Sequence, residues 1–258
     1  MKVTYNWLKE FIDLDLPPGD LIESFENLGI EVEDFRDLSE GLKSRVVVGE
    51  IVEIKSHPRR PDWKVIRVDV GERKVVSVSG APNLELRGKV VYGLPGTILP
   101  DGTKISEKEL LGIKSFGMPL SEEDLGVPIE SEGVINLPQG LEVGSSPLPY
   151  LLLNDWLYDL YITPNRPDLL SVMGLARELH VKLGIPYREI DPTVVEKKQV
   201  GTFPVFVEAP EGCPRYTARL VRNIKVGDSP PQIRYRLSWC GIRPITVSYT
   251  HMTLPTKT

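Results

Sequence analysis

The chain has 258 residues, a formal net charge of −5 and 41% hydrophobic residues. This length suits about two domains at ~100 to 200 residues each, and no apolar run approaches the ~20 residues that span a bilayer. Met1–Glu10 lacks a basic segment followed by an apolar run, so no secretory signal is predicted. Two cysteines, Cys213 and Cys240, predict a reducing, cytoplasmic setting without a disulfide framework or a zinc site.

The charge is unevenly distributed along the chain. Residues 1–39 contain three basic and ten acidic side chains, whereas residues 212–245 contain seven basic side chains and one acidic one. The negative total disfavours a protein that coats nucleic acid in general. A polyanion would be attracted to the second region and not to the first.

Residues 1–39 predict a small acidic α+β unit. Asn6 is expected to be the N-cap of a short helix. A second helix is expected from about Asp20 to Gly29, and residues 30–35 alternate as a strand does. The apolar side of the first helix carries Trp7, Leu8, Phe11 and Ile12, and that of the second carries Leu21, Ile22, Phe25 and Leu28.

From about Val46 the pattern changes to short β-rich runs separated by glycine-containing turns. Several short strands within about a hundred residues predict a small closed barrel, and a five-stranded OB barrel, which often binds nucleic acid, is the commonest that fits. The expected strands are residues 46–55, 64–70, 74–79 and 89–92.

The loop between the first two strands carries a basic cluster with an aromatic residue inside it. Basic side chains pair with phosphates, and an aromatic ring can stack on a base. A charged loop that is merely solvated is the competing interpretation. His57 is expected to be a hydrogen-bonded turn residue, because no second histidine lies at metal-ligand spacing. The candidate nucleic-acid-binding residues are Lys55, Arg59, Arg60, Trp63 and Lys64.

The stretch from Thr163 to Gly184 has a complete set of helix signals. Two prolines predict a stiff lead-in, Asp168 takes the N-cap position, and Gly184 ends the helix. A docked core helix is the simplest interpretation. Asn165 and Arg166 also form a rigid polar point suited to a carboxylate, a phosphate or a neighbouring domain. The apolar stripe is Leu169, Val172, Met173, Ala176, Leu179 and Leu183.

This stretch also resembles a known family. TPNRPDLLSVMGLARE, residues 163–178, is similar to the TPNRPDCLSV-G-ARE segment of bacterial phenylalanyl-tRNA synthetase beta subunits. YNWLKEFIDLDL and LGIEVED near the start resemble the same family. Residues 57–64, 79–83 and 115–118 resemble, in order and spacing, its tRNA-binding OB module. Pro119 and Trp63 depart from the usual pattern: the first cannot donate a strand hydrogen bond, and the second either stacks or packs on the barrel.

The resemblance implies a multidomain α+β architecture. An OB-fold barrel at residues 40–150 is inserted into a small α+β N-terminal domain made of residues 1–39 and 151–192. Pattern alone also allows two consecutive domains.

After Pro192 the pattern predicts strands at 203–208 and 217–222, then a helix opened by Asp228 and stopped by Gly241. CPRY at 213–216 and GIRPI at 241–245 resemble the entry to the family's editing module. Residues 200–245 would then begin an incomplete α/β editing-type domain, with Arg243 at the edge of its pocket.

Residues 246–258 stop following the family. TVSYTHMTLPT resembles a sequencing adapter translated in one frame. Our hypothesis is that this tail is not native and that the natural chain is much longer, so His251 receives no function.

The sequence contains no Ser-His-Asp set, P-loop, dinucleotide glycine pattern or zinc signature, so we expect no catalysis by this chain alone. The resemblance implies a scaffold and tRNA-binding part of phenylalanine-tRNA ligase, a cytoplasmic enzyme of two alpha and two beta subunits that uses ATP and Mg. No membrane partner and no bound metal are expected for the chain itself. A free-standing tRNA-binding OB-fold protein and a structural interaction protein without RNA affinity are the alternatives.

Overall fold

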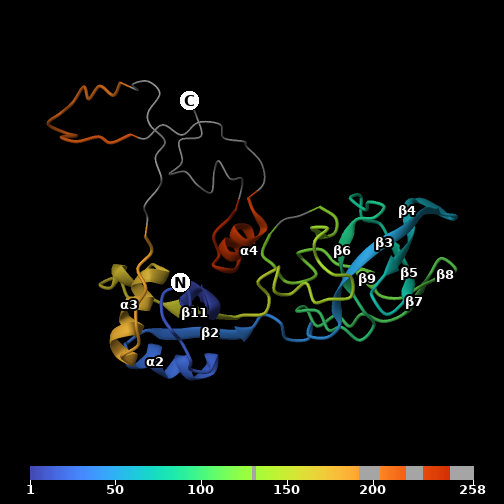
Figure 1. Ribbon diagram of the computed structural model, residues 1–258, viewed down its shortest axis with the longest axis horizontal. Helices are drawn as coiled ribbons and strands as arrows, with labels where there is room; N and C mark the ends of the chain where they lie inside the picture. Colours follow the sequence, from blue (N-terminus) through green and yellow to red (C-terminus); the bar gives the residue numbers. More distant parts are fainter. Residues whose placement is uncertain (130–131, 192–203, 219–228, 245–258) are drawn as a thin grey trace.

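The computed structural model describes residues 1–129, 132–191, 204–218 and 229–244. It is an α+β protein with antiparallel strand pairing, built around a three-stranded and a six-stranded sheet (Figure 1). No helix in the described part of the chain is long and apolar enough to cross a membrane. The helices are α1 (Tyr5–Leu8), α2 (Leu21–Asn27), α3 (Val172–Leu183) and α4 (Pro231–Trp239), with short 3₁₀ turns η1 (Pro18–Asp20) and η2 (Pro167–Leu169).

The three-stranded sheet joins distant parts of the chain. Its order is β1 (Lys2–Thr4), β11 (Trp156–Tyr161) and β2 (Glu31–Asp37), with β11 antiparallel to both neighbours. Asp37 at the end of β2 is paired with Trp156 at the start of β11. The chain therefore leaves this sheet and returns to it at the same place.

Helices α1, α2 and α3 pack with this sheet around one apolar core. Phe25 of α2 meets the ring of Tyr158 of β11 edge-on, with centroids 5.5 Å apart. The Tyr158 hydroxyl donates to the carbonyl of Pro18 at 2.7 Å, so this buried phenol keeps a partner. The largest fully buried side chains of this core include Leu8, Ile12, Leu21, Phe25 and Tyr158.

The start of α3 differs from the sequence-based prediction. Helix α3 begins at Val172, and the hydroxyl of Ser171, its N-cap, accepts a hydrogen bond from the Gly174 amide at 3.0 Å. Asp168 is not the N-cap; it lies in η2. Ser171 has extended backbone angles that break the helix from the turn before it, and serine caps as well as aspartate does. The left-handed Gly184 that ends α3 is confirmed, with φ of 65°.

The N-cap prediction for α1 is also wrong. Thr4 precedes the helix, and Asn6 lies inside it. The cap comes instead from Asp155, 149 residues away, whose carboxylate accepts from the Asn6 amide at 2.9 Å and the Trp156 amide at 2.8 Å. Asp155 is 4% exposed. A carboxylate at a helix start satisfies free N–H groups and favours the helix dipole.

The six-stranded sheet contains all four strands expected between residues 46 and 92. Its order is β10-β6-β3-β4-β5, and β9 also pairs with β6. Within the described residues no strand pairing closes this sheet into a barrel. The strands are β3 (Val46–His57), β4 (Arg60–Asp69), β5 (Lys74–Ser79), β6 (Lys89–Gly93), β9 (Met118–Pro119) and β10 (Asn136–Leu137).

A buried polar network holds residues 115–117 against β5. The Phe116 amide donates to the Val76 carbonyl at 2.8 Å. The hydroxyl of Ser115 accepts from the Val78 amide at 3.1 Å and lies 3.2 Å from that of Ser77. Gly117, with φ of 74°, turns the chain tightly over β6.

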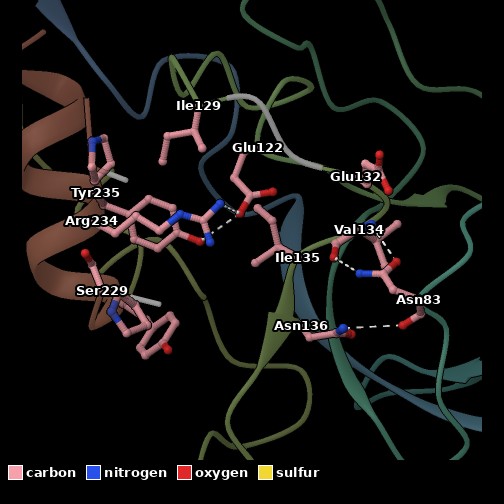
Figure 2. Close-up of a pocket in the computed structure, with 13 residues that line it drawn as sticks. Asn83, Glu122, Ile129, Glu132, Val134, Ile135, Asn136, Ser229, Arg234 and Tyr235 are labelled. Atoms are coloured by element: carbon pink, nitrogen blue, oxygen red, sulfur yellow. Dashed lines mark hydrogen bonds and ion pairs between the residues drawn. The ribbon is translucent and has the colours of Figure 1, made fainter. Parts of the chain in front are cut away.

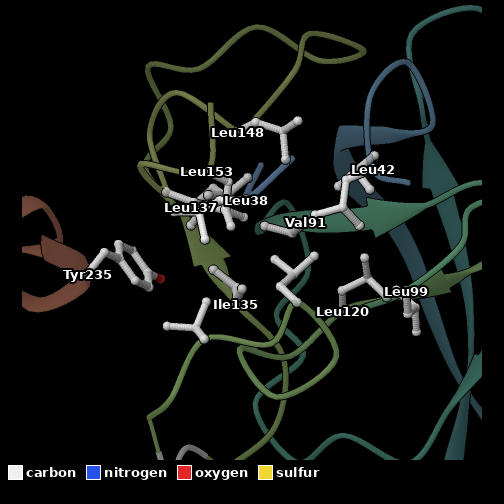
Figure 3. Close-up of a cluster of buried hydrophobic side chains, with 14 of the residues drawn as sticks. Leu38, Leu42, Val91, Leu99, Leu120, Ile135, Leu137, Leu148, Leu153 and Tyr235 are labelled. Carbon is white, nitrogen blue, oxygen red and sulfur yellow. The ribbon is translucent and has the colours of Figure 1, made fainter. Parts of the chain in front are cut away.

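Helix α4 lies between the two sheets (Figure 1). Tyr235 and Trp239 are buried in one apolar cluster with Leu157 of β11 and residues of the six-stranded sheet (Figure 3). Arg236 pairs with Glu10. The helix expected after Asp228 is therefore present, although Asp228 itself lies outside the described residues. The strand expected at 203–208 is not formed over residues 204–208, and most of the one expected at 217–222 lies outside the described residues.

Replacing Asp155 should show how strongly the two chain halves depend on it. Asp155→Ala leaves two backbone N–H groups without their partner, so we expect the free energy of unfolding to fall by about 2–4 kcal/mol. Asp155→Asn keeps an acceptor oxygen and is the matched control. Urea unfolding measures both, and equal losses for Ala and Asn would contradict the capping role.

Comparing the natural chain with Asp155→Asn also gives a prediction about pH. Burial raises the pKa of the Asp155 carboxyl, because the charged form is desolvated. The folded state therefore keeps this proton to higher pH than the unfolded chain, whose aspartates titrate near ~3.9. The stability that the raised pKa of Asp155 contributes is fully present below the unfolded-state pKa. It is lost as pH rises through the raised pKa of the folded state. Asp155→Asn should therefore gain stability relative to the natural chain as pH rises from 4 to 7.

Gly117 gives a test of the tight turn. Gly117→Ala should lower the free energy of unfolding by about 2–5 kcal/mol, from left-handed strain and from overpacking against the Tyr92 ring, 2.9 Å from the added methyl. Gly102→Ala is the control, because Gly102 also has positive φ but open space around it; about 1–2 kcal/mol is expected there. Equal losses at the two sites would contradict the close approach.

Candidate nucleic-acid interface

The five predicted tRNA-binding residues lie together on one β-ribbon. β3 ends at His57 and β4 begins at Arg60, so Pro58 and Arg59 form the turn of a long two-stranded ribbon. The side chains of Lys55, Arg59 and Arg60 are exposed, whereas Trp63 and Lys64 are half-buried. The ribbon ends at the part of the six-stranded sheet farthest from α3 (Figure 1).

These basic residues differ in how their charge is balanced. Lys55 pairs with Glu53, and Arg60 pairs with Asp62 at 3.1 Å. Lys64 donates to the Ser56 hydroxyl at 3.4 Å. Within the part of the chain that the structure describes, no ion pair involves Arg59 or Lys64. Their positive charge is therefore available to an external anion.

Trp63 packs on its own ribbon. The Arg60 guanidinium lies over its ring, 4.4 Å from the centroid. The His57 ring meets it edge-on, with centroids 6.4 Å apart. Such a cation–π contact contributes about 0.5–1 kcal/mol at an exposed site. Of the two alternatives for this residue, packing is observed, and a base could stack on Trp63 on this side only by displacing Arg60.

His57 joins the ribbon turn to a neighbouring hairpin. It is 1% exposed, and its Nδ1 accepts from the Arg59 amide at 3.2 Å. Its Nε2 faces the Leu110 carbonyl at 3.4 Å and donates to it in the tautomer that leaves Nδ1 free to accept. Leu110 ends β7 (Lys108–Leu110), which pairs with β8 (Ile113–Ser115). His57 is thus a hydrogen-bonded turn residue, as the sequence predicted.

The charge of the polar group before α3 is balanced by neighbouring side chains. This group, which lies beside the three-stranded sheet's core, consists of Asn165, Arg166 and Asp168. The Arg166 guanidinium pairs with Asp168 at 2.8 Å and with Glu178 of α3 at 2.9 Å. The hydrogen bond from Arg166 lowers the pKa of the Asp168 carboxyl. Asn165 is exposed. Arg166 therefore fastens the lead-in to α3, and it does not meet the β3–β4 ribbon.

A polar cavity of about 500 Å³ lies between α4 and the segment around β10 (Figure 2). Glu122, 5% exposed, pairs there with Arg234 at 3.2 Å, and the Tyr235 hydroxyl lies 3.5 Å from the same carboxylate. Burial raises the pKa of Tyr235. Arg243 is exposed and does not line this cavity, although Pro244 does.

Sequence reasoning missed this Glu122–Arg234 pair, because its members lie far apart in the chain. In the described residues, no group of His, Cys, Asp or Glu side chains could hold a metal ion.

A family model of a known domain matches the middle of the chain. Residues 46–146 match the model of a putative tRNA-binding domain. This range contains the β3–β4 ribbon, the β7–β8 hairpin and all strands of the six-stranded sheet.

Related sequences extend over nearly the whole chain. It is 40% identical over 247 residues to the phenylalanine-tRNA ligase beta subunit of Geobacter metallireducens, which covers 95% of this chain and 31% of the relative. The beta subunit of Pasteurella multocida is 37% identical over 252 residues, with the same coverage. Among solved structures, a MetRS-related protein from Pyrococcus horikoshii aligns with 51% of this chain and 97% of its own, at 16% identity and a TM-score of 0.29.

The chain thus spans about a third of the length of the curated relatives that it matches. Over 95% of its length the chain is similar in sequence to part of curated phenylalanine-tRNA ligase beta subunits, at 40% identity to those of Geobacter metallireducens and Geobacter sulfurreducens.

Proposed function

We propose that this chain acts as the N-terminal portion of a phenylalanine-tRNA ligase beta subunit, in which the β3–β4 ribbon binds the tRNA backbone. The observation that carries the proposal is the pair Arg59 and Lys64: two cations without ion-pair partners in the described structure, inside residues 46–146, on a chain that is acidic overall. Phosphate is the anion that such a surface meets on tRNA. Lys55 and Arg60 join them by exchanging their exposed carboxylate partners for phosphate, since exposed ion pairs are worth little.

The rest of the enzyme supplies the chemistry. ATP and Mg act in the complete ligase, which attaches phenylalanine to its tRNA in the cytoplasm with two alpha and two beta subunits. This chain contributes a scaffold and an RNA contact, and the fragment alone is inactive. Residues 200–245 begin the editing-type domain, with Arg243 at its pocket edge, and residues 246–258 are a non-native tail.

Two features support an OB barrel at residues 40–150 inserted between residues 1–39 and 151–192. The Phe116–Val76 backbone hydrogen bond and the β9–β6 pairing connect β5 to β6 through residues 116–119. β5 is one edge strand of the sheet and β6 lies next to the other edge strand, β10, so this link runs in the direction in which a small barrel closes. The pairing of Asp37 with Trp156 lets the inserted segment leave and return at one point of the three-stranded sheet.

Binding of a phenylalanine-accepting tRNA transcript at several salt concentrations tests the RNA contact. Removing a phosphate contact reduces the slope of log affinity against log salt by about 1, so Arg59→Ala/Lys64→Ala should reduce it by about 2. The control is Arg177→Ala/Lys182→Ala, which makes the same change in net charge at exposed positions of α3. If both double variants change the slope equally, the ribbon is not the contact.

A chimaera tests the place of this chain in the ligase. Residues 1–245 replace the matching third of the Geobacter metallireducens beta subunit, which is then purified with its alpha subunit. We expect phenylalanylation of tRNA, and with Arg59→Ala/Lys64→Ala a raised KM for tRNA at unchanged KM for phenylalanine. A chain that binds tRNA but gives an inactive, unassembled chimaera would instead be a free-standing tRNA-binding protein.

A further inference from the structure

The geometry points to a second half of the RNA surface: we infer that the β7–β8 hairpin binds tRNA together with Arg59. In this arrangement Lys108 and Lys114 contact phosphates, and Leu111 at the hairpin tip contacts a ribose or base. His57 is a positioning residue that locks the hairpin to the ribbon turn. The inference rests on the proposed tRNA-binding function and names further contacts at that surface.

The hairpin and the ribbon turn are in direct contact. His57 Nε2 lies 3.4 Å from the Leu110 carbonyl. Gly112 is at the tip of the β7–β8 hairpin. A Cβ added there would lie 3.8 Å from the nearest guanidinium nitrogen of Arg59, so this guanidinium lies beside the tip. A two-stranded hairpin of three-residue strands is marginal alone. Its place therefore depends on these contacts and on the packing of β8 against β5.

The hairpin presents basic side chains on the outside. Ser115 is buried, and Leu110 and Ile113 are half-buried, whereas Lys108 and Lys114 are exposed. Glu109 is opposite Lys114 in the strand pairing, yet no ion pair forms between them, and none involves Lys108 in the described structure. With Arg59, the hairpin thus adds cations whose charge is not taken by a salt bridge.

The tip carries a leucine where the two-residue hairpin turn needs positive φ. Leu111 has φ of 50° and is 45% exposed. A branched apolar residue is unfavourable at positive φ, where Gly, Asn or Asp is the usual choice for a hairpin turn. Strained residues of this kind concentrate at functional positions. An exposed leucine between Lys108, Lys114 and Arg59 suits the apolar face of a nucleoside whose phosphates those cations hold.

The first experiment measures tRNA binding by the full chain with Lys108→Ala/Lys114→Ala. We expect weaker binding and a salt slope reduced by about 2, one unit for each phosphate contact. The control is Arg177→Ala/Lys182→Ala, with the same charge change. If the hairpin variant behaves like this control while Arg59→Ala/Lys64→Ala weakens binding, the inference fails and the proposed function stands. If all three variants bind like the natural chain, both fail.

Leu111→Gly separates binding from folding. Glycine relieves the positive φ, so the midpoint of thermal unfolding should not fall, whereas tRNA affinity should fall roughly fivefold, as expected for loss of one base contact. A stabilised variant with unchanged affinity would overturn the role of the leucine.

The role of His57 is tested by a double-mutant cycle. His57→Leu loses the bond to the Leu110 carbonyl, so adding Lys108→Ala/Lys114→Ala to it should weaken tRNA binding less than it does in the natural chain. His57→Gln keeps a hydrogen-bond donor near the Nε2 position. In this variant Lys108→Ala/Lys114→Ala should weaken tRNA binding as much as in the natural chain. If His57→Leu lowers stability but the lysine variants still act in full, His57 is structural and not a positioning residue.

Discussion

The buried carboxylate of Asp155 is the constraint on which the three-stranded sheet and its helices α1, α2 and α3 depend. It accepts from the amides of Asn6 and Trp156, so it both caps α1 and fixes the chain where β11 begins. Thr4, the residue before α1, makes no side-chain hydrogen bond to the free amides of the helix, so the acceptor comes from Asp155. The start of α1 is therefore held by a residue that follows the six-stranded sheet in the chain, and the two segments share one apolar core.

The structure also separates cations that serve the fold from cations that remain available. Arg166 is held by Asp168 and Glu178, and Arg236 is held by Glu10 while its guanidinium lies over the Trp7 ring. Arg59 stands at the end of a projecting ribbon without such a partner in the described structure. The sequence alone does not distinguish an arginine that is ion-paired in the fold from one that is not. Their surroundings decide which of them can meet an external phosphate.

Local signals in the sequence were sufficient for the long elements. The strands β3 to β6 were expected because β-branched residues run between glycine turns, and α3 because its apolar stripe ends at Gly184. β7, β9 and β10 are too short to leave a pattern, and β11 is defined by its neighbours on both sides. The candidate RNA residues were predicted from a basic cluster with an aromatic residue inside it. The hairpin beside them was not predicted, because tertiary contacts, among them that of His57 with Leu110 and that of β8 with β5, bring it there.

The paired strand ends Asp37 and Trp156 have a mechanical consequence. A domain on one flexible linker swivels freely, but here two chain crossings, side by side, form a stem that resists twisting. Helix α4 braces the same junction, with Trp239 in the core and Arg236 on α1's side. A force applied to the β3–β4 ribbon by a bound polymer would therefore be transmitted to β11 and α1. The six-stranded sheet would move together with the three-stranded sheet and would not rotate independently of it.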